Sequence, residues 1–191
     1  MALNATRINF GCGQFPEAGW VNVDVDPRAP ADVHHDLEQF PYPFPSESAE
    51  AIKAYHVLEH LHQPFAAMGE FARILRPGGE LVIRVPHFSR GFTHADHKRG
   101  FDVSFPLYFN PAFRGGYCGV TLQHVHTRLR WFAQPELKRQ TLGTGTASAA
   151  AAIGRVVDAL AGLSPYLASR LWCFWVGGFE EVEFVFRRGR V

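Results

Sequence analysis

The chain has 191 residues, of which 47% are hydrophobic and 19% are charged, and its formal net charge is +1. These values are typical of one globular domain, here spanning residues 1–191, and they exclude a largely disordered chain. So small a net charge gives no electrostatic reason to expect nucleic acid or an anionic membrane as a partner. The three cysteines are widely spaced with no C-x-x-C pair, so they predict neither a disulfide framework nor a zinc knuckle and favour a cytoplasmic protein.

Short apolar runs predict strands that alternate with crossovers in the first half of the chain. The predicted strands are Ile8–Phe10, Val21–Val25, Ala51–Tyr55, Leu81–Val85, His124–Trp131 and Val182–Arg187. A helix is predicted from Pro64 to Leu75, because Met68, Phe71, Ala72 and Leu75 recur at helical spacing. The alternation of strands and crossovers favours a parallel sheet with helices on both faces.

The longest apolar region, residues 147–179, predicts a second amphipathic helix. Its stripe is expected to be buried and consists of Ile153, Val156, Val157, Leu160 and Leu163. Charged residues and a proline interrupt this region, so we expect no membrane span, and residues 1–7 are too short and polar for a signal peptide. An apolar surface left by Leu171–Phe179 would support a homodimer.

The segment I-N-F-G-C-G-Q-F-P-E-A-G-W-V-N-V-D-V-D, residues 8–26, carries the first functional signal. Gly11 and Gly13 follow a short strand, and glycine allows a ligand to approach the backbone closely because it has no Cβ. The next strand ends in carboxylates, which can accept both hydroxyl hydrogens of a ribose. The segment therefore predicts a pocket for an adenosine-containing cofactor.

Three further motifs follow in order: D-L-E-Q-F-P-Y-P-F at 36–44, A-I-K-A-Y-H-V-L-E-H-L at 51–61 and R-P-G-G-E-L-V-I-R-V-P-H at 76–87. Over residues 8–105 this order resembles the small, type-11-like branch of the class I S-adenosylmethionine-dependent methyltransferases. The resemblance implies a Rossmann-like, doubly wound α/β sheet that is mostly parallel, with an antiparallel last strand and strand order 3-2-1-4-5-7-6. It also implies S-adenosylmethionine as the cofactor.

The resemblance assigns roles to individual residues. Gly11, Cys12 and Gly13 would line the methionine end of the cofactor, Asp24 would hold the ribose, Asp36 and Leu37 would flank the adenine, and His56 would lie beside the sulfonium. Asp26 remains the alternative to Asp24. Glu59 and His60 match the same motif and are expected to be structural. Only Gln14–Trp20 separate Gly13 from the second strand, so the first crossover helix must be reduced to a turn.

Residues 88–122 are rich in phenylalanine, glycine and proline without clear periodicity, and we interpret them as a substrate-facing cap. The candidate catalytic residues are His87, which directly precedes the cap and is the first choice for a base, and His94, Asp96 and His97 within it. Histidine titrates near neutral pH and can accept a proton from an oxygen nucleophile. Two other interpretations stay open: the four residues bind a divalent metal ion, or they hydrogen-bond to the loop backbone and hold the cap closed.

These patterns favour an enzyme that transfers a methyl group from S-adenosylmethionine to a small or sugar-like acceptor, at an oxygen atom. One alternative is a catalytically silent protein that binds the cofactor and serves as an interaction partner, which the shortened glycine loop favours. The other is a metal-dependent hydrolase that uses the His87/His94/Asp96/His97 cluster.

Overall fold

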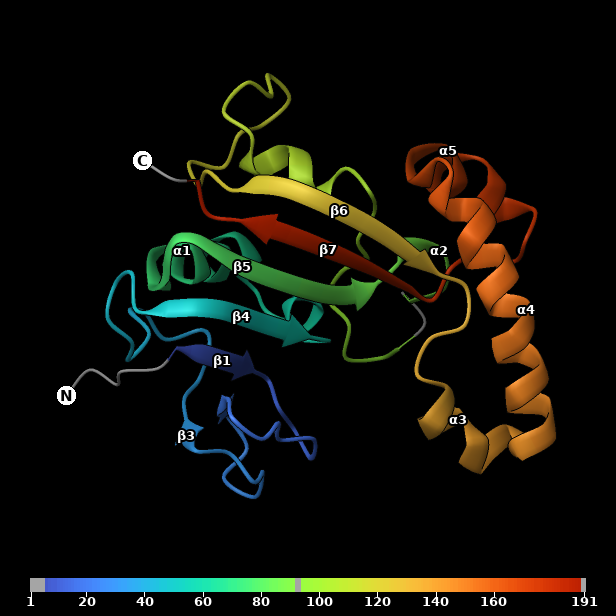
Figure 1. Cartoon of the computed structure of the whole chain (residues 1–191), viewed down its shortest axis with the longest axis horizontal. Helices are drawn as coiled ribbons and strands as arrows, with labels where there is room; N and C mark the ends of the chain where they lie inside the picture. Colours follow the sequence, from blue (N-terminus) through green and yellow to red (C-terminus); the bar gives the residue numbers. More distant parts are fainter. Residues whose placement is uncertain (1–5, 92–93, 190–191) are drawn as a thin grey trace.

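The computed structural model describes residues 6–91 and 94–189, so two positions of the expected cap, 92 and 93, lie outside the described residues. Seven strands form one sheet in the order β3-β2-β1-β4-β5-β7-β6 (Figure 1). They are β1 (Arg7–Phe10), β2 (Val21–Asp24), β3 (Val33–His34), β4 (Ala49–Tyr55), β5 (Leu75–Pro86), β6 (Gln123–Arg130) and β7 (Glu181–Arg187). β7 runs antiparallel to both of its neighbours, and the other pairings are parallel. The predicted fold class and strand order are confirmed.

The helical elements are mostly short. They are η1 (Leu58–His60), α1 (Pro64–Ile74), α2 (Phe88–Gly91), η2 (Phe105–Phe109), α3 (Pro135–Leu142), α4 (Thr144–Gly162), α5 (Pro165–Arg170) and η3 (Trp172–Phe174). The helix predicted from Pro64 forms as α1 and ends one residue early, where Leu75 already pairs with Ala49 in the sheet. Within the described ranges, no helix has the length and apolarity that crossing a bilayer requires.

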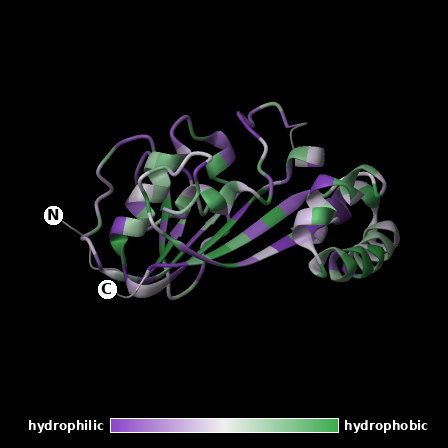
Figure 2. Ribbon diagram, turned by 90° about the horizontal axis from the view of Figure 1, so that it is seen from above, coloured by the Kyte–Doolittle hydropathy of each residue, from purple (hydrophilic) through white to green (hydrophobic). Residues whose placement is uncertain are grey.

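One face of the sheet carries the hydrophobic core. Alternate residues of each strand point to this face because side chains along a strand have a period of two. Phe10 of β1 lies 4.9 Å, between ring centroids, from Phe71 of α1, and Phe184 of β7 lies 5.6 Å from Phe105 of η2. Figure 2 shows the covering helices on this side of the sheet and a separate helical group at one end. α1 and η2 therefore close the core.

The opposite face near β1, β4 and β5 is polar. Lys53 of β4 lies 4.8 Å from the centre of the Trp20 ring and forms an ion pair with Glu17. Arg84 of β5 donates to Glu183 of β7 at 2.6 Å. The segment Gln14–Trp20 thus takes the place of the first crossover helix, as its shortness predicted, and the charged side chains lie close to a cleft instead of under a helix.

The prediction of a buried stripe in the late helix is wrong. Four of its large residues are more than half exposed: Ile153 at 55%, Val156 at 62%, Leu160 at 52% and Leu163 at 83%. The buried residues of α4 are small and recur every seven positions: Ala147, Gly154 and Ala161. A Cβ added at Gly154 would lie 3.1 Å from Cβ of Phe132, so close approach of the helix to the chain after β6 requires small side chains. Helical spacing identified an apolar face, but not which face is buried.

Candidate active site

The glycine loop follows β1 directly and has two left-handed residues, Gly11 with φ +67° and Gly13 with φ +51°. The Val23 carbonyl accepts hydrogen bonds from Gly11 N at 2.8 Å and Cys12 N at 3.1 Å. A Cβ at Gly11 would lie 2.2 Å from Cγ2 of Val57, whereas a Cβ at Gly13 would meet nothing within 4 Å. Gly11 is therefore required by packing, and Gly13 leaves open space above the loop.

Asp24 supports this loop from the end of β2. Its Oδ2 accepts from Gly13 N at 2.7 Å and its Oδ1 accepts from Asp26 N at 2.9 Å. Asp26 instead forms an ion pair with the exposed Arg28 at 2.9 Å. Of the two carboxylates that the sequence left open, Asp24 is the one that contacts the glycine loop.

A cavity of about 680 Å³ opens between the glycine loop and α3, and we call it the loop cavity. Gly11, Cys12, Gly13 and His56 line it, as do Lys53, Tyr55, Arg84, Glu136, Leu137 and Glu181. This size is within the usual range for small-molecule and cofactor sites. Burial raises the pKa of the Cys12 thiol, which keeps that side chain protonated. Four of the seven residues expected at the cofactor thus lie around one cavity.

Asp36 and Leu37 lie just beyond β3, where His34 pairs with Asp24. The Asp36 side chain is exposed and accepts from Glu38 N at 2.9 Å, and the buried Leu37 accepts from the Tyr42 hydroxyl through its carbonyl at 2.9 Å. Neither residue lines the loop cavity. They follow the edge strand β3, whereas His56 follows β4 on the other side of β1 and β2.

His56 directly follows β4 and is in the left-handed region, with φ +56°. Its Nε2 lies 2.8 Å from Oε2 of Glu181 and its Nδ1 lies 3.3 Å from Oε1 of Glu59. Burial alone would lower the pKa of His56, but the two neighbouring carboxylates outweigh it and raise the pKa to about 9. His56 is thus held as an imidazolium between two carboxylates at the edge of the loop cavity.

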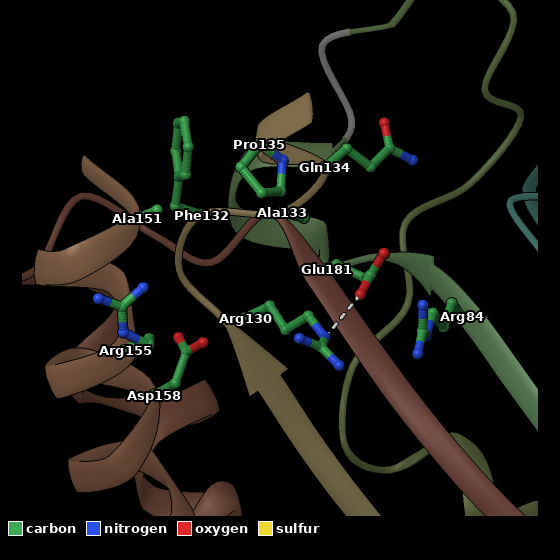
Figure 3. Close-up of a pocket in the computed structure, with 10 residues that line it drawn as sticks. All are labelled: Arg84, Arg130, Phe132, Ala133, Gln134, Pro135, Ala151, Arg155, Asp158 and Glu181. Carbon is green, nitrogen blue, oxygen red and sulfur yellow. Dashed lines mark ion pairs between the residues drawn. The ribbon is translucent and has the colours of Figure 1, made fainter. Parts of the chain in front are cut away.

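Glu181 lines both the loop cavity and a smaller cavity of about 300 Å³ at the end of β6 (Figure 3). Arg130 Nε lies 3.0 Å from Glu181 Oε1, and Arg84 lies on the other side of β7. Arg155 and Asp158 of α4 line the far wall. This cavity was not predicted, because its residues come from strands and a helix that are distant along the chain.

His94 and His97 line a third cavity of about 410 Å³, the histidine cavity, together with His56 and His60. The rings of His94 and His97 are stacked with centroids 4.6 Å apart, and the centroids of His60 and His97 are 5.0 Å apart. Asp96 contributes its backbone, because its carbonyl oxygen lies 3.3 Å from Nδ1 of His60, while its side chain is exposed. From the sequence, His60 was expected to be structural and was not predicted as a site residue. The H-V-L-E-H motif, which ends at His60, is the signal that could have identified it.

His87 lies elsewhere. It is fully buried, and its Nδ1 and Nε2 lie 2.7 Å and 2.8 Å from the hydroxyls of Ser89 and Ser169. Burial lowers its pKa to about 4. His87 lines neither the loop cavity nor the histidine cavity, so its position contradicts the expectation of a base at the acceptor. The four-residue metal cluster, an alternative left open by the sequence, does not form either, because His87 contacts Ser169 of α5 and lies outside the histidine cavity.

Residues 17–83, about a third of the chain, match the family model of the methyltransferase domain. No curated protein matches the chain. Among solved structures, an S-adenosylmethionine-dependent methyltransferase from Archaeoglobus fulgidus is 13% identical with a TM-score of 0.59, covering 96% of this chain and 86% of its own. The YcgJ protein from Bacillus subtilis is 14% identical with a TM-score of 0.54, covering 100% and 94%.

A third solved structure was determined with the cofactor. Phosphoethanolamine N-methyltransferase 2 from Haemonchus contortus, in complex with S-adenosyl-L-methionine, is 15% identical with a TM-score of 0.51, covering 100% of this chain and 50% of its own. Residues 17–83 thus match a methyltransferase-domain model, and the chain shares the fold of solved methyltransferases, an S-adenosylmethionine-dependent one among them. The Haemonchus contortus neighbour binds S-adenosyl-L-methionine, a cationic nucleoside. In this chain the open side of Gly13 leaves room beside the loop cavity for a nucleoside of this kind.

Proposed function

We propose that this protein transfers the methyl group of S-adenosylmethionine to an oxygen atom of a small or sugar-like acceptor. One observation carries the proposal: the loop cavity and the histidine cavity share His56 and Gln134 as lining residues. A donor in one cavity and an acceptor in the other would meet at His56. The enzyme's contribution to such an in-line transfer is mainly alignment and exclusion of water.

On the donor side, S-adenosylmethionine supplies an electrophilic methyl group bound to a sulfonium. The backbone of Gly11, Cys12 and Gly13 would receive the methionine end, and Asp24 would accept the ribose hydroxyls while it holds Gly13 N. Asp36 and Leu37 would lie on the adenine side. Of the carboxylates that line the loop cavity, Glu181 contacts His56 and would lie near the sulfonium.

On the acceptor side, His94 and His97 are the candidate bases. They line the histidine cavity, and an imidazole there can take the proton that an acceptor hydroxyl releases as its oxygen is methylated. Asp96 would position His60 through its carbonyl. We do not include His87, because no acceptor reaches a fully buried ring that two serines already bind.

The test is a calorimetric titration with S-adenosylhomocysteine, followed by acceptor screening. Asp24→Ala should weaken binding by about 1.5–3 kcal/mol, the usual cost of losing a hydrogen bond to a charged group. Asp26→Ala is the matched control and should bind as the wild type, because the Asp26 side chain pairs with the exposed Arg28. Hydroxyl-bearing small molecules and sugars would then be screened for methyl transfer.

Unchanged affinity in Asp24→Ala would contradict the ribose assignment. A folded wild type that binds no S-adenosylhomocysteine would contradict the methyltransferase proposal itself and favour a silent relative of the fold. Methylation at nitrogen alone would contradict only the choice of acceptor atom.

We also propose that the protein forms a homodimer through the outer surface of its helical group, which we call the α4–α5 face. Its residues are Leu163, Leu167, Leu171, Phe174 and Trp175, and each is at least 55% exposed. Large exposed apolar patches mark association surfaces in soluble proteins. Phe179, which the sequence placed in the same apolar segment, is instead fully buried and belongs to the core.

A further inference from the structure

Glu59 is a buried carboxylate with an incomplete set of partners. Its side chain is fully buried, and within the described ranges neither of its oxygens accepts a hydrogen bond. The His56 imidazolium lies 3.3 Å from Oε1 and offsets part of the charge, but Glu181 holds that ring more closely, at 2.8 Å. Burying an ionised carboxylate without hydrogen bonds is costly, so this group calls for a further cationic partner.

Two histidines supply the remaining ligands for such a partner. One oxygen of Glu59 and one ring nitrogen each of His60 and His97 all lie within 4.8 Å of one another. Nε2 of His97 lies 3.9 Å from Oε1 of Glu59. Two ligands bound to one zinc ion in tetrahedral geometry are about 3.4 Å apart, so small side-chain movements would bring these atoms into coordination range.

The local structure holds this cluster in place. Lys98 N donates to the Glu59 carbonyl at 2.9 Å, and the Lys98 ammonium donates to the His60 carbonyl. A His60 ring that donates its Nδ1 hydrogen to the Asp96 carbonyl, 3.3 Å away, keeps its lone pair on Nε2. A backbone partner of this kind orients many metal-binding histidines. The segment after residue 93 is thereby tied to η1.

We propose that Glu59, His60 and His97 bind a divalent transition-metal ion. Two imidazoles and one carboxylate are a ligand set that zinc and related ions accept, and three protein ligands leave coordination positions open. His60 and His97 line the histidine cavity, so an open position is available to an oxygen atom of a bound molecule. Arg90 and Lys138 line the same cavity and both pair with Glu180, so the bound molecule would meet positive charge there as well.

The role of the ion as an anchor for the acceptor rests on the proposed function, but metal binding itself does not. An anionic or hydroxyl oxygen of the acceptor would bind the ion and be held near His56. This set shares only His97 with the cluster expected from sequence, since it includes Glu59 and His60 and excludes His87, His94 and Asp96. With the ion bound, His97 is a ligand, so His94 is the base that stays available for the acceptor.

The experiment uses tag-free protein stripped with a chelator. Zn²⁺ is titrated by calorimetry, and Co²⁺ is titrated by its visible absorption, which reports nitrogen and oxygen coordination. We expect one ion per chain, with affinity reduced on the order of tenfold or more in both Glu59→Gln and His97→Ala. His62→Ala is the matched control, because His62 is exposed and lies outside the cluster, and its affinity should equal that of the wild type.

The proposal is overturned if the wild type binds no stoichiometric ion, if both variants bind like the wild type, or if His62→Ala weakens binding equally. Circular dichroism checks folding, and His97→Ala keeps the test valid if Glu59→Gln fails to fold. S-adenosylhomocysteine binding is measured on the same samples. Retained nucleoside binding without metal binding would remove the metal site alone, whereas metal binding without nucleoside binding would leave the site and contradict the methyltransferase proposal.

Discussion

Gly11 and Gly13 show how neighbouring residues of one loop serve different ends. Both are left-handed, and both are expected to be intolerant of substitution on that ground alone. Their surroundings differ: Gly11 is packed against Val57, whereas Gly13 is open to the loop cavity. Stability and cofactor binding should therefore respond differently to the same change at the two positions.

We expect Gly11→Ala to lower the free energy of unfolding by about 2–4 kcal/mol, since strain adds to a clash with Val57. Gly13→Ala should cost only about 1–2 kcal/mol, the strain alone, and should weaken S-adenosylhomocysteine binding because the new methyl group projects toward the cofactor. Urea unfolding and calorimetry measure the two effects. The prediction would be contradicted if the two variants lost equal stability, or if Gly13→Ala bound S-adenosylhomocysteine as tightly as the wild type.

His56 should make stability depend on pH above neutrality. Its folded-state pKa of about 9 exceeds the ordinary value of 6.5, so its contribution is fully present below pH 6.5 and is lost as the pH rises through 9. Each pKa unit corresponds to about 1.4 kcal/mol, and the contribution is at most about 3 kcal/mol because the ring is partly solvated. Urea unfolding between pH 6 and 10 should show this loss in the wild type and in the exposed His126→Gln control. If His56→Gln lost the same amount of stability between pH 6 and 10, the loss would come from another titrating group.

At the scale of elements, α4 reverses the usual arrangement of an amphipathic helix. Ala147, Gly154 and Ala161 are its buried residues, and Ile153, Val156 and Leu160 point outward, while Val157 is partly buried against the core. The helix can therefore approach Trp131 and Phe132 closely, which positions Asp158 to accept a hydrogen bond from Trp131 N at 2.7 Å. This contact fixes the end of β6, where Arg130 meets Glu181.

Gly154→Val should therefore destabilise the protein by about 1–3 kcal/mol through overpacking against Phe132. Gly145→Ala is the control, because a Cβ at Gly145 meets nothing within 4 Å and should be neutral or slightly stabilising. Thermal or urea unfolding compares the two variants. A neutral Gly154→Val would show that α4 is not held through this contact.

At the scale of the whole molecule, the helical group α3–α5 stands at one end of the sheet, away from α1 (Figure 1). Its exposed α4–α5 face is apolar, while the loop cavity and the histidine cavity lie nearer the sheet. A homodimer formed through this face would leave both cavities accessible. Association surfaces of stable dimers bury about 1,200–2,000 Å² in total, which demands several large residues per copy.

Light scattering coupled to gel filtration tests the dimer. The wild type should elute as a dimer, and Leu171→Ser with Trp175→Ser should convert it to a monomer. Val125→Ser, at an exposed apolar residue of β6 outside this face, should leave the dimer unchanged. A monomeric wild type would contradict the proposal, as would dissociation by the Val125 variant alone.

Local patterns were sufficient for much of the fold. Alternating apolar residues located all but one strand, and the missed strand, β3, has only two residues. The motifs around Gly11–Gly13 and His56 identified residues that the structure brings to one cavity. The four-residue catalytic set was less predictable: His94 and His97 reach the histidine cavity, but His87 is buried eighty-two positions away in sequence from its Ser169 partner.

The sequence by itself determined the order of strands and crossovers and the position of the glycine loop, because these depend on short-range periodicity and on conformations that only glycine adopts readily. The tertiary structure alone decided which side of α4 is buried, which histidines meet Glu59, and that Asp24 rather than Asp26 contacts the loop. Those outcomes depend on packing and electrostatics between segments far apart in the chain, which no local pattern encodes.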